Sequence, residues 1–536
     1  MYNSAKSLLF ILLLTGASVF AQTASDTTMT MQEAQLKLER FMQLIDSKYL
    51  EDVDPGVMVD EAINAILEHL DPHSVYFTEE ELQQANEPLE GNFEGVGIQF
   101  NILRDTIIVV NTISGGPSEK VGIMSGDKIV VIDGENVAGI GITNKGVTDR
   151  LRGPKGTRVK VSIDRKGLTK PQDFSITRDV IPLYSVDASY MLDPETGYIR
   201  VSKFAASTVE EFRDAVSELK GDGMENLILD LRGNGGGYLN AAIDLSDEFL
   251  DAGKLIVYTD GRAYPRQDAY ATSFGKMQSG KVVVLIDESS ASASEIVSGA
   301  LQDWDRALIV GRRSFGKGLV QRPYNLTDGS AVRLTVSRYY TPSGRCIQKP
   351  YDDGIDAYHK DLDERFQDGE LTADHVFEYP DSLKYFTNAK RVVYGGGGIM
   401  PDIYVPIDTT WTTEYYLDIL RNSLHNQFSL TYVNDHREEL NKQYPDAFAF
   451  LNGFKVTEGL WKEFIDYATS EEVAFNEEEF ETCKERLDLL LRSTIARNLY
   501  DFEAFWVVYN SQDEAIDKAM EAMHDETFRK MKIASK

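Results

Sequence analysis

Cysteine and positive charge are both scarce in this chain of 536 residues. Its two cysteines, Cys346 and Cys483, are too few for a disulfide framework and cannot supply a cysteine-rich zinc site. The chain has 55 Lys and Arg residues and 86 Asp and Glu residues, so its formal net charge is −31. Because so acidic a surface repels phosphate backbones, we expect no nucleic-acid partner.

Long apolar runs are absent after residue 22, where no segment approaches the about 18 consecutive apolar residues of a membrane span. The one short run, Ser7 to Phe20, follows Lys6 and ends beside Ala21. A positive start, a short apolar stretch and a small residue at the cut predict a signal peptide over residues 1–22. The mature chain is therefore expected to be exported and periplasmic, with a retained anchor as the alternative.

Composition and periodicity divide the rest of the chain into four regions. Apolar residues at helical spacing predict an N-terminal helical region over 23–84, and short β-type runs between glycine turns predict a β-rich module over 85–180. Alternating strand and helix patterns predict an α/β core over 181–405. Helical, aromatic-rich sequence predicts a C-terminal helical region over 406–536, whereas the acidic stretch 348–392 is expected to be irregular.

Three glycine- or serine-rich turns follow buried strands of the predicted α/β core. They are 230–237 (DLRGNGGG), 289–295 (SSASASE) and 311–318 (GRRSFGKG). Ligands of open α/β sheets bind at the carboxyl ends of the strands, so we expect the three turns to meet in one crevice. The glycines of the first turn would let backbone N–H groups approach a substrate carbonyl, although a plain strand–helix turn has the same composition.

The serine turn allows two interpretations. A tight turn of small residues can expose a hydroxyl group, and the N–H groups of the helix that follows can stabilise an oxyanion. Serine is also a favoured residue at a helix N-cap, a role that suits Ser294 with Glu295 beside it. The turn by itself leaves a nucleophile and a cap equally open.

A serine nucleophile needs a base, and no histidine occurs between residues 74 and 358. A Ser-His-Asp triad would need a histidine from another region, while His73 is interpreted as a structural residue that ends a helix. Lys317 is the local candidate, because Ser-Lys pairs are a known variant. The pKa of a free lysine is ~10.4, so the site would have to lower it by about 3 units to make a useful base. A solvated surface lysine is the alternative.

The turn over 311–318 also nearly matches a phosphate-binding P-loop. Gly318 stands where a serine or threonine would hold magnesium, and residues 319–324 are predicted to form a strand where a P-loop must open a helix. An exported protein also meets no nucleotide. We therefore expect no nucleotide partner.

Together these motifs resemble those of the carboxy-terminal processing proteases (tail-specific proteases), a Ser-Lys peptidase family. The resemblance spans nearly the whole mature chain and is strongest over 289–321, where Lys317 stands 25 positions after Ser292 and Gln321 four positions after Lys317. It implies that Ser292 is the nucleophile, that Lys317 is the general base and that Gln321 orients the lysine. Position within the motif favours Ser292 over its neighbours; the competing serines are Ser290 and Ser294.

The same resemblance implies an oxyanion hole. Its donors would be the backbone N–H groups of Gly235 or Gly236 and of Ala293. Gly235 departs from the family pattern, since many relatives have proline there. Further segments that are similar to the family are 70–74 (LDPHS), 339–345 (YYTPSGR) and 397–402 (GGIMPD).

The β-rich module resembles a PDZ domain. The segment 115–134, from Gly-Gly-Pro to Asp-Gly, carries much of that similarity. In such a domain, successive N–H groups of one loop hold the terminal carboxylate of a peptide that adds to the sheet as an extra strand. The resemblance implies that this loop consists of Gly95, Val96, Gly97 and Ile98. Arg152 is a weak candidate for coupling the module to the active site, and a surface-loop arginine is the alternative.

The expected fold is an α/β protease core with an inserted β-rich PDZ domain and helical N- and C-terminal regions. The expected function is that of an exported serine endopeptidase that uses a Ser-Lys dyad, without metal or cofactor, on proteins recognised through their C-terminal tails. Its partners would be protein or peptide substrates with free C-termini and, through the helical ends, a second copy of the chain. The alternative is a catalytically silent PDZ adaptor, against which the intact set of Ser292, Lys317 and Gln321 argues.

Overall fold

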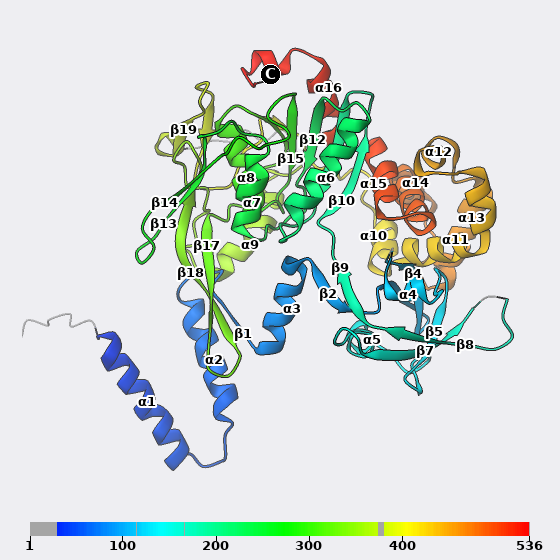
Figure 1. Ribbon diagram of the computed structural model, residues 1–536, viewed down its shortest axis with the longest axis horizontal. Helices are drawn as coiled ribbons and strands as arrows, with labels where there is room; N and C mark the ends of the chain where they lie inside the picture. The colour runs from blue at the N-terminus through cyan, green and yellow to red at the C-terminus, as the bar shows by residue number, and fades with distance from the viewer. Residues whose placement is uncertain (1–28, 114, 166, 373–379, 535–536) are drawn as a thin grey trace, which may run out of the picture. The chain divides into compact units, whose positions relative to one another are not determined.

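A computed structural model describes residues 29–113, 115–165, 167–372 and 380–534 (Figure 1). The predicted signal peptide, residues 1–22, lies outside the described residues. Two compact units make up the chain, Met1–Ile63 and Asn64–Lys536. Within the described part, no helix is both long enough and apolar enough to cross a lipid bilayer.

The first unit consists of helix α1 (Met31–Lys48) and the start of α2 (Pro55–Glu68), as the helical spacing predicts. Thr30 begins α1 with a capping box, in which its hydroxyl accepts from the Glu33 N–H and the Glu33 carboxylate accepts from the Thr30 N–H. No residue of α1 is buried. Its larger apolar side chains, Leu38, Phe41 and Leu44 among them, are exposed.

A six-stranded, mostly parallel sheet forms the centre of the second unit. The strand order is β10-β11-β12-β15-β16-β21, and only β10 runs antiparallel to its neighbour. The strands are β10 (Val186–Met191), β11 (Thr196–Val201), β12 (Asn226–Asp230), β15 (Val282–Ile286), β16 (Leu308–Gly311) and β21 (Ile403–Tyr404). This arrangement confirms the α/β core.

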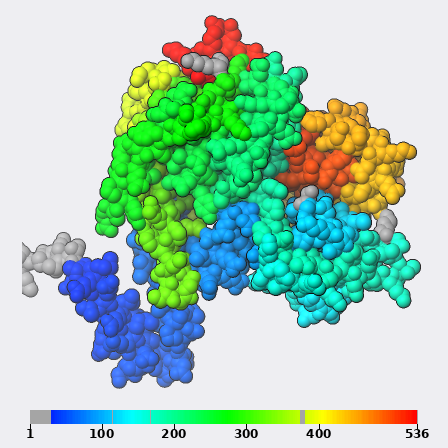
Figure 2. Space-filling model, viewed as in Figure 1, coloured from blue at the N-terminus to red at the C-terminus, as the bar shows by residue number. Residues whose placement is uncertain are grey.

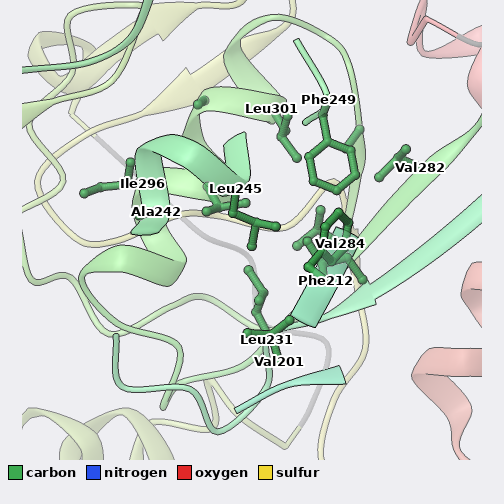
Figure 3. Packing of buried hydrophobic residues seen from close by; sticks show 14 of the residues in the cluster. Val201, Phe212, Leu231, Ala242, Leu245, Phe249, Val282, Val284, Ile296 and Leu301 are labelled. Atoms are coloured by element: carbon green, nitrogen blue, oxygen red, sulfur yellow. The ribbon is translucent and has the colours of Figure 1, made fainter. Parts of the chain in front are cut away.

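One face of this sheet is covered by three helices, which are α6 (Thr208–Gly221), α7 (Leu239–Asp247) and α8 (Ala293–Asp303). Figure 3 shows Phe212 of α6, Leu245 of α7 and Leu301 of α8 packed toward the strand residues. Those strand residues include Val201 and Val284, which are fully buried. Each of the three helices therefore has an apolar side that is fixed against the sheet.

The opposite face is covered by the last helices of the chain, α15 (Phe502–Tyr509), α16 (Glu514–His524) and α17 (Thr527–Lys530). Alternate strand residues such as Ile228 and Val283 pack there against Ile516. Parallel strands are apolar on both faces and need cover on both. The helices α15, α16 and α17 therefore complete the core, although the predicted boundary at residue 406 assigns them to another region. Helical periodicity cannot reveal which surface a helix covers.

A second sheet joins distant parts of the chain. Its strands are β1 (Val75–Phe77), β13 (Leu255–Asp260), β14 (Gln267–Tyr270), β17 (Leu319–Asn325) and β18 (Ala331–Tyr340). Because β1 pairs with β18, part of the predicted N-terminal region belongs to the core. The stretch expected to be irregular instead contains α9 (Ile355–Gln367), β19 (Lys384–Phe386) and β20 (Val392–Tyr394), and Tyr358 of α9 is buried.

A two-stranded sheet of β2 (Asn92–Gly95) and β9 (Asp179–Pro182) connects the β-rich module to the rest of the chain. Strand β2 follows directly after α3 (Glu79–Glu90). Within the module, the sheet has the order β3-β4-β5-β7-β8, with β6 beside β5. The elements are β3 (Ile98–Leu103), β4 (Thr106–Thr112), α4 (Pro117–Lys120), β5 (Lys128–Ile132), β6 (Glu135–Asn136), α5 (Asn144–Leu151), β7 (Arg158–Asp164) and β8 (Gln172–Thr177). The module is thus inserted into the chain between two strands that pair with each other.

Five further helices form a separate aromatic-rich cluster. They are α10 (Glu414–Arg421), α11 (Leu424–Gln443), α12 (Ala447–Gly453), α13 (Glu458–Ser470) and α14 (Glu477–Leu499). Phe450, Trp461 and Phe464 are buried in it. The free cysteine Cys483 also lies there.

Candidate active site

The three special turns meet, as expected, at one edge of the central sheet. They follow β12, β15 and β16, which are consecutive in the strand order and parallel. A cavity of about 510 Å³ lies there and is lined by residues of every turn, including Gly235, Ser292 and Lys317. Because β17 rather than a helix follows Lys317, the third turn is not a P-loop.

The three candidate serines differ in what their hydroxyl groups do. Ser290 is fully buried, and its Oγ donates to the Leu231 carbonyl over 2.9 Å. Ser294 is also fully buried, and its Oγ donates to the Asn234 carbonyl over 2.8 Å. Ser292, which begins α8, is the one of the three that lines the cavity. Of the three serines, Ser292 is therefore the one placed next to the space that a substrate carbonyl group could occupy.

The backbone at Ser292 has an unusual conformation, with φ 54° and ψ −107°. The backbone of a residue other than glycine is strained when φ is positive, so the surrounding structure must hold such a residue in place. The Glu295 carboxylate does so by accepting a 2.8 Å hydrogen bond from the Ser292 N–H. The resulting sharp turn between β15 and α8 presents the Ser292 side chain to the cavity.

Glu295 also binds the lysine turn. Its carboxylate accepts from the N–H groups of Gly316 at 2.7 Å and of Lys317 at 2.9 Å, and from the Ser314 hydroxyl at 2.5 Å. Burial raises the pKa of Glu295, although these hydrogen bonds to the charged form act in the opposite direction. One buried carboxyl group therefore holds the backbones of Ser292 and Lys317 together.

Tyr339 of β18 makes a second link between the same two residues. Its buried hydroxyl lies 2.7 Å from the Lys317 carbonyl oxygen and 3.1 Å from that of Ser292, and can donate to either. Glu295 thus contacts the N–H groups and Tyr339 the carbonyl groups of one pair of residues. The relative position of Ser292 and Lys317 is fixed from both sides.

The surroundings of Lys317 favour a neutral amine. Burial is the main cause that lowers the pKa of Lys317, and the nearby positive charge of Arg333 lowers it further. The negative charges of Glu295 and Asp71 oppose this shift. Among the described residues, the Lys317 amine makes no hydrogen bond or ion pair, so it remains available to a partner in the cavity.

Gln321 lines the same cavity, four residues after Lys317 on β17. Its Nε2 donates to the Thr335 hydroxyl over 3.3 Å, and Thr335 donates in turn to Asp71 over 2.9 Å. The pairing register of β17 shifts between Val320 and Gln321, an irregularity that re-aims a side chain. The side-chain nitrogen of Gln321 is therefore hydrogen-bonded to Thr335, and its side-chain oxygen can accept a hydrogen bond from another group.

His73 lies near the site but outside the cavity. Its Nε2 is 2.7 Å from the Tyr358 hydroxyl, and burial, aided by the positive charge of Lys317, lowers the pKa of His73 to about 4. The ring is therefore neutral at pH 7. His73 joins α9 to the LDPHS turn and is not among the residues that line the cavity.

The glycine turn approaches Ser292 very closely. A Cβ atom on Gly236 would lie 2.9 Å from the Ser292 Cβ and 3.1 Å from the Ala293 nitrogen, so only glycine fits at this point. The Gly236 N–H already donates to the Asn234 side chain at 2.9 Å. Of the three N–H groups expected to form the oxyanion hole, those of Gly235 and Ala293 donate to no partner within the part of the chain that is described.

A buried ion network anchors the start of the glycine turn. The Asp230 carboxylate accepts from Arg200 at 2.8 Å and from Arg232 at 2.7 Å. Although burial alone would raise it, these two guanidinium groups hold the pKa of Asp230 well below its usual range. Arg232 also pairs with Asp513 at 2.8 Å, so the N-terminus of α16 holds the loop that carries Gly235.

Three residues of this site were not among the sequence-predicted ones. Glu295 belongs to the serine motif but was interpreted only as a cap partner, and Tyr339 belongs to the YYTPSGR segment without an assigned role. Arg333 lines the cavity and carries a positive charge next to Lys317. Regular alternation along a strand over residues 330–340 would place residues 333 and 339 on one face, which is the signal that could have found both.

In the PDZ module, three of the four residues of the predicted carboxylate loop are buried, and the fourth, Ile98, begins β3 and is partly exposed. Gly95, Val96 and Gly97 have little exposed surface, and the N–H groups of Val96 and Gly97 donate to no partner in the described chain. Buried N–H groups without partners favour an anion. Next to this loop, Arg152 lies over the Phe93 ring at 4.5 Å and pairs with Glu87 of α3.

In the described ranges, no group of three or more His, Cys, Asp or Glu side chains is arranged to hold a metal ion.

Comparisons with known proteins agree with this architecture. Residues 195–357 match the profile of peptidase family S41, residues 95–176 match the PDZ domain, and residues 415–501 match a family of unknown function (DUF8443). The chain is 37% identical over 340 residues to a carboxy-terminal-processing protease of Bartonella bacilliformis. The matched segment covers 62% of this chain and 77% of that protein. The chain is 36% identical over 314 residues to the carboxy-terminal processing protease CtpA of Bacillus subtilis, covering 58% and 66%.

A solved structure of a photosystem II D1 C-terminal processing protease is also similar, with 26% identity, a TM-score of 0.36, and coverage of 69% of this chain and 87% of that one. The α/β core with its inserted PDZ domain is that of a serine-type endopeptidase. The chain belongs to peptidase family S41, among the carboxy-terminal processing proteases.

Proposed function

We propose that the chain cleaves proteins by a Ser292–Lys317 dyad, after capturing their C-terminal tails on the PDZ module. The observation that carries the dyad is the double link between the two residues. Glu295 accepts from both backbone N–H groups, and the Tyr339 hydroxyl lies against both carbonyl groups. Ser292 is also the one of the three candidate serines that lines the cavity.

In this mechanism the neutral Lys317 amine takes the proton of the Ser292 hydroxyl as Oγ attacks the peptide carbonyl carbon. The developing oxyanion is stabilised by the N–H groups of Gly235 and Ala293. The Lys317 ammonium then gives its proton to the leaving amine, and the acyl-enzyme is hydrolysed by water that Lys317 deprotonates in turn. In the reacting complex the Gln321 carbonyl oxygen would orient the lysine by accepting a hydrogen bond from it.

Tail capture uses the loop of Gly95, Val96, Gly97 and Ile98. The N–H groups of Val96 and Gly97 would bind the terminal carboxylate, and the tail would pair with the free edge of β3. The catalytically silent adaptor, the competing proposal, would bind the same tails without cleaving them.

Amidation of the substrate tail tests capture and cleavage together. We expect wild-type protein to cleave a denatured protein or long peptide with a free C-terminus, and amidation to lower kcat/KM about tenfold through KM. The reason is that an amide loses the charge that the loop N–H groups bind. Equal kcat/KM for both forms would contradict capture, and binding without cleavage of either would favour the adaptor.

Export is proposed from the sequence of residues 1–22 alone. The cut is expected after the small residue Ala21, so N-terminal sequencing of the protein from the periplasmic fraction should begin at Gln22, the last residue of the predicted segment 1–22. Protein that begins at Met1 in that fraction would favour a retained anchor.

A homodimer that pairs through α1 is supported by the exposure of this helix. No residue of α1 is buried, and its larger apolar side chains are exposed. Exposed rows of apolar side chains are typical of surfaces that pair. We expect deletion of residues 31–50 to turn a dimer into a monomer in sedimentation velocity experiments. An unchanged sedimentation coefficient, after correction for mass, would contradict this pairing.

A further inference from the structure

The free edge of the PDZ sheet sets the path of a captured tail. Among the described strands, β3 pairs with β4 on one side only. A tail whose carboxylate sits at the loop before β3 must run antiparallel to this strand. Because β3 has six residues and a strand rises ~3.3 Å per residue, about 20 Å of tail would lie along it. The sixth residue or so from the C-terminus would therefore reach Leu103.

A second cavity opens at that point. Its volume is about 500 Å³, and its PDZ wall includes Asn101 and Leu103 at the end of β3 and Asn144 at the start of α5. The opposite wall comes from the junction of α10 and α11, with Asn422 and Gln427. This space, called the upstream cavity below, thus continues the line of β3 into the helical region.

The helical wall is attached to the PDZ module itself. Leu430 of α11 is only 1% exposed and packs against Ile108 and Val110 of β4. Arg437 donates to the Ser125 hydroxyl at 2.9 Å. Figure 2 shows the PDZ surface (cyan) directly beside the surface of these helices (orange). A tail on the PDZ edge would therefore meet a wall in a fixed place.

The chemistry of the upstream cavity is that of uncharged polar groups. Asn101, Asn144 and Asn422 line it with side-chain amides. The Gln427 amide also lines it but is already bonded to the Asn422 carbonyl and the Tyr467 hydroxyl. Its one cation, Arg421, is already paired with acidic side chains of α10. Amides both donate and accept hydrogen bonds, so they suit the backbone and the uncharged polar side chains of an extended chain.

We propose that the upstream cavity is a subsite for the residues about six to eight positions before the C-terminus of a substrate tail. It favours uncharged polar residues there. The helical region over residues 415–501, whose family has no known function, would then extend the recognition groove. This inference rests on the proposed capture of tails by the PDZ loop.

The first test compares tail lengths. Full-length Ser292→Ala protein would be titrated by fluorescence anisotropy with peptides of four and nine residues that share their last four residues, the longer one with Ser and Asn upstream. We expect the longer peptide to bind about tenfold more tightly, and amidation to weaken both. Equal affinity of the two lengths would overturn the subsite.

The second test introduces a charge into the cavity wall. Asn422 is exposed, and its amide donates to the carbonyl four residues before it over 2.9 Å. Asn452 on α12 is exposed, makes the equivalent bond over 2.9 Å and does not line the cavity. In the same Ser292→Ala protein, Asn422→Lys should raise the preference for Glu over Lys at positions six to eight about tenfold, whereas Asn452→Lys should leave it unchanged.

The outcomes separate the two proposals. If amidation has no effect on the four-residue peptide, tail capture is wrong and the subsite falls with it. If amidation weakens binding but neither tail length nor Asn422→Lys has an effect, only the subsite is wrong. An equal change in both lysine variants would mean a general charge effect and would also overturn the subsite.

Discussion

Replacing Ser292 by alanine is expected to lower kcat/KM for protein cleavage by about 10⁴-fold or more, and Lys317→Met should cost a similar factor. A nucleophile and its base act as one unit, so the loss of either removes nearly all of their joint contribution. Initial rates on a denatured protein, measured with folding confirmed by circular dichroism, provide the test. The matched control is Ser289→Ala, which changes an exposed serine of the same turn.

The pH profile of the wild-type protein tests the base separately. Lys317 must be neutral to accept a proton, and a neutral amine forms as the pH rises. Because burial lowers the pKa of Lys317 from its usual value, kcat/KM should rise with pH along a limb whose midpoint lies below the lysine range. Full activity retained down to about pH 4, or Lys317→Met within tenfold of wild type, would show that another group is the base.

Replacing Glu295 by glutamine should lower kcat about 10²-fold while the protein remains folded. The Ser292 and Lys317 N–H groups both donate to Oε2 of Glu295, whereas the Ser314 hydroxyl and the Gly316 N–H donate to Oε1. In either orientation the amide NH₂ group of glutamine would therefore meet at least one backbone N–H group that now donates to the carboxylate. Movement of the two residues apart by about 1 Å is enough for such a loss. We expect KM to change little, since Glu295 does not line the cavity.

A control variant separates this positioning effect from simple damage to the core. Glu248 is also fully buried, and it accepts from Arg213 and from the Lys276 N–H on another part of the core. Glu248→Gln should lower the free energy of unfolding by about 1–3 kcal/mol, as should Glu295→Gln, but leave kcat near wild type. Equal kcat for the two variants would contradict a positioning role for Glu295.

The sequence was most informative where local pattern and strand order coincide. Buried apolar runs predicted the strands, and the turns after them were expected at one edge because parallel strands end together. The choice among Ser290, Ser292 and Ser294 came from the family motif. The structure adds a reason that the local pattern did not contain, since two of these hydroxyl groups are already bonded in the core.

Contacts between distant segments could not be predicted in the same way. Tyr339 reaches Ser292 over 47 residues, and α9, within a stretch expected to be irregular, packs Tyr358 against His73. Helical periodicity in the C-terminal region indicated an apolar face but not its partner. The structure shows that α16 packs against the central sheet, whereas Leu430 of α11 packs against the PDZ module.

The pairing of Arg232 with Asp513 has a consequence for biosynthesis. The two residues are 281 positions apart, so the glycine turn leaves the ribosome long before the aspartate that anchors it. Until α16 docks, one face of the central sheet also lacks its cover. A partly translated polypeptide should therefore hydrolyse nothing, and this delay protects other newly made proteins from it.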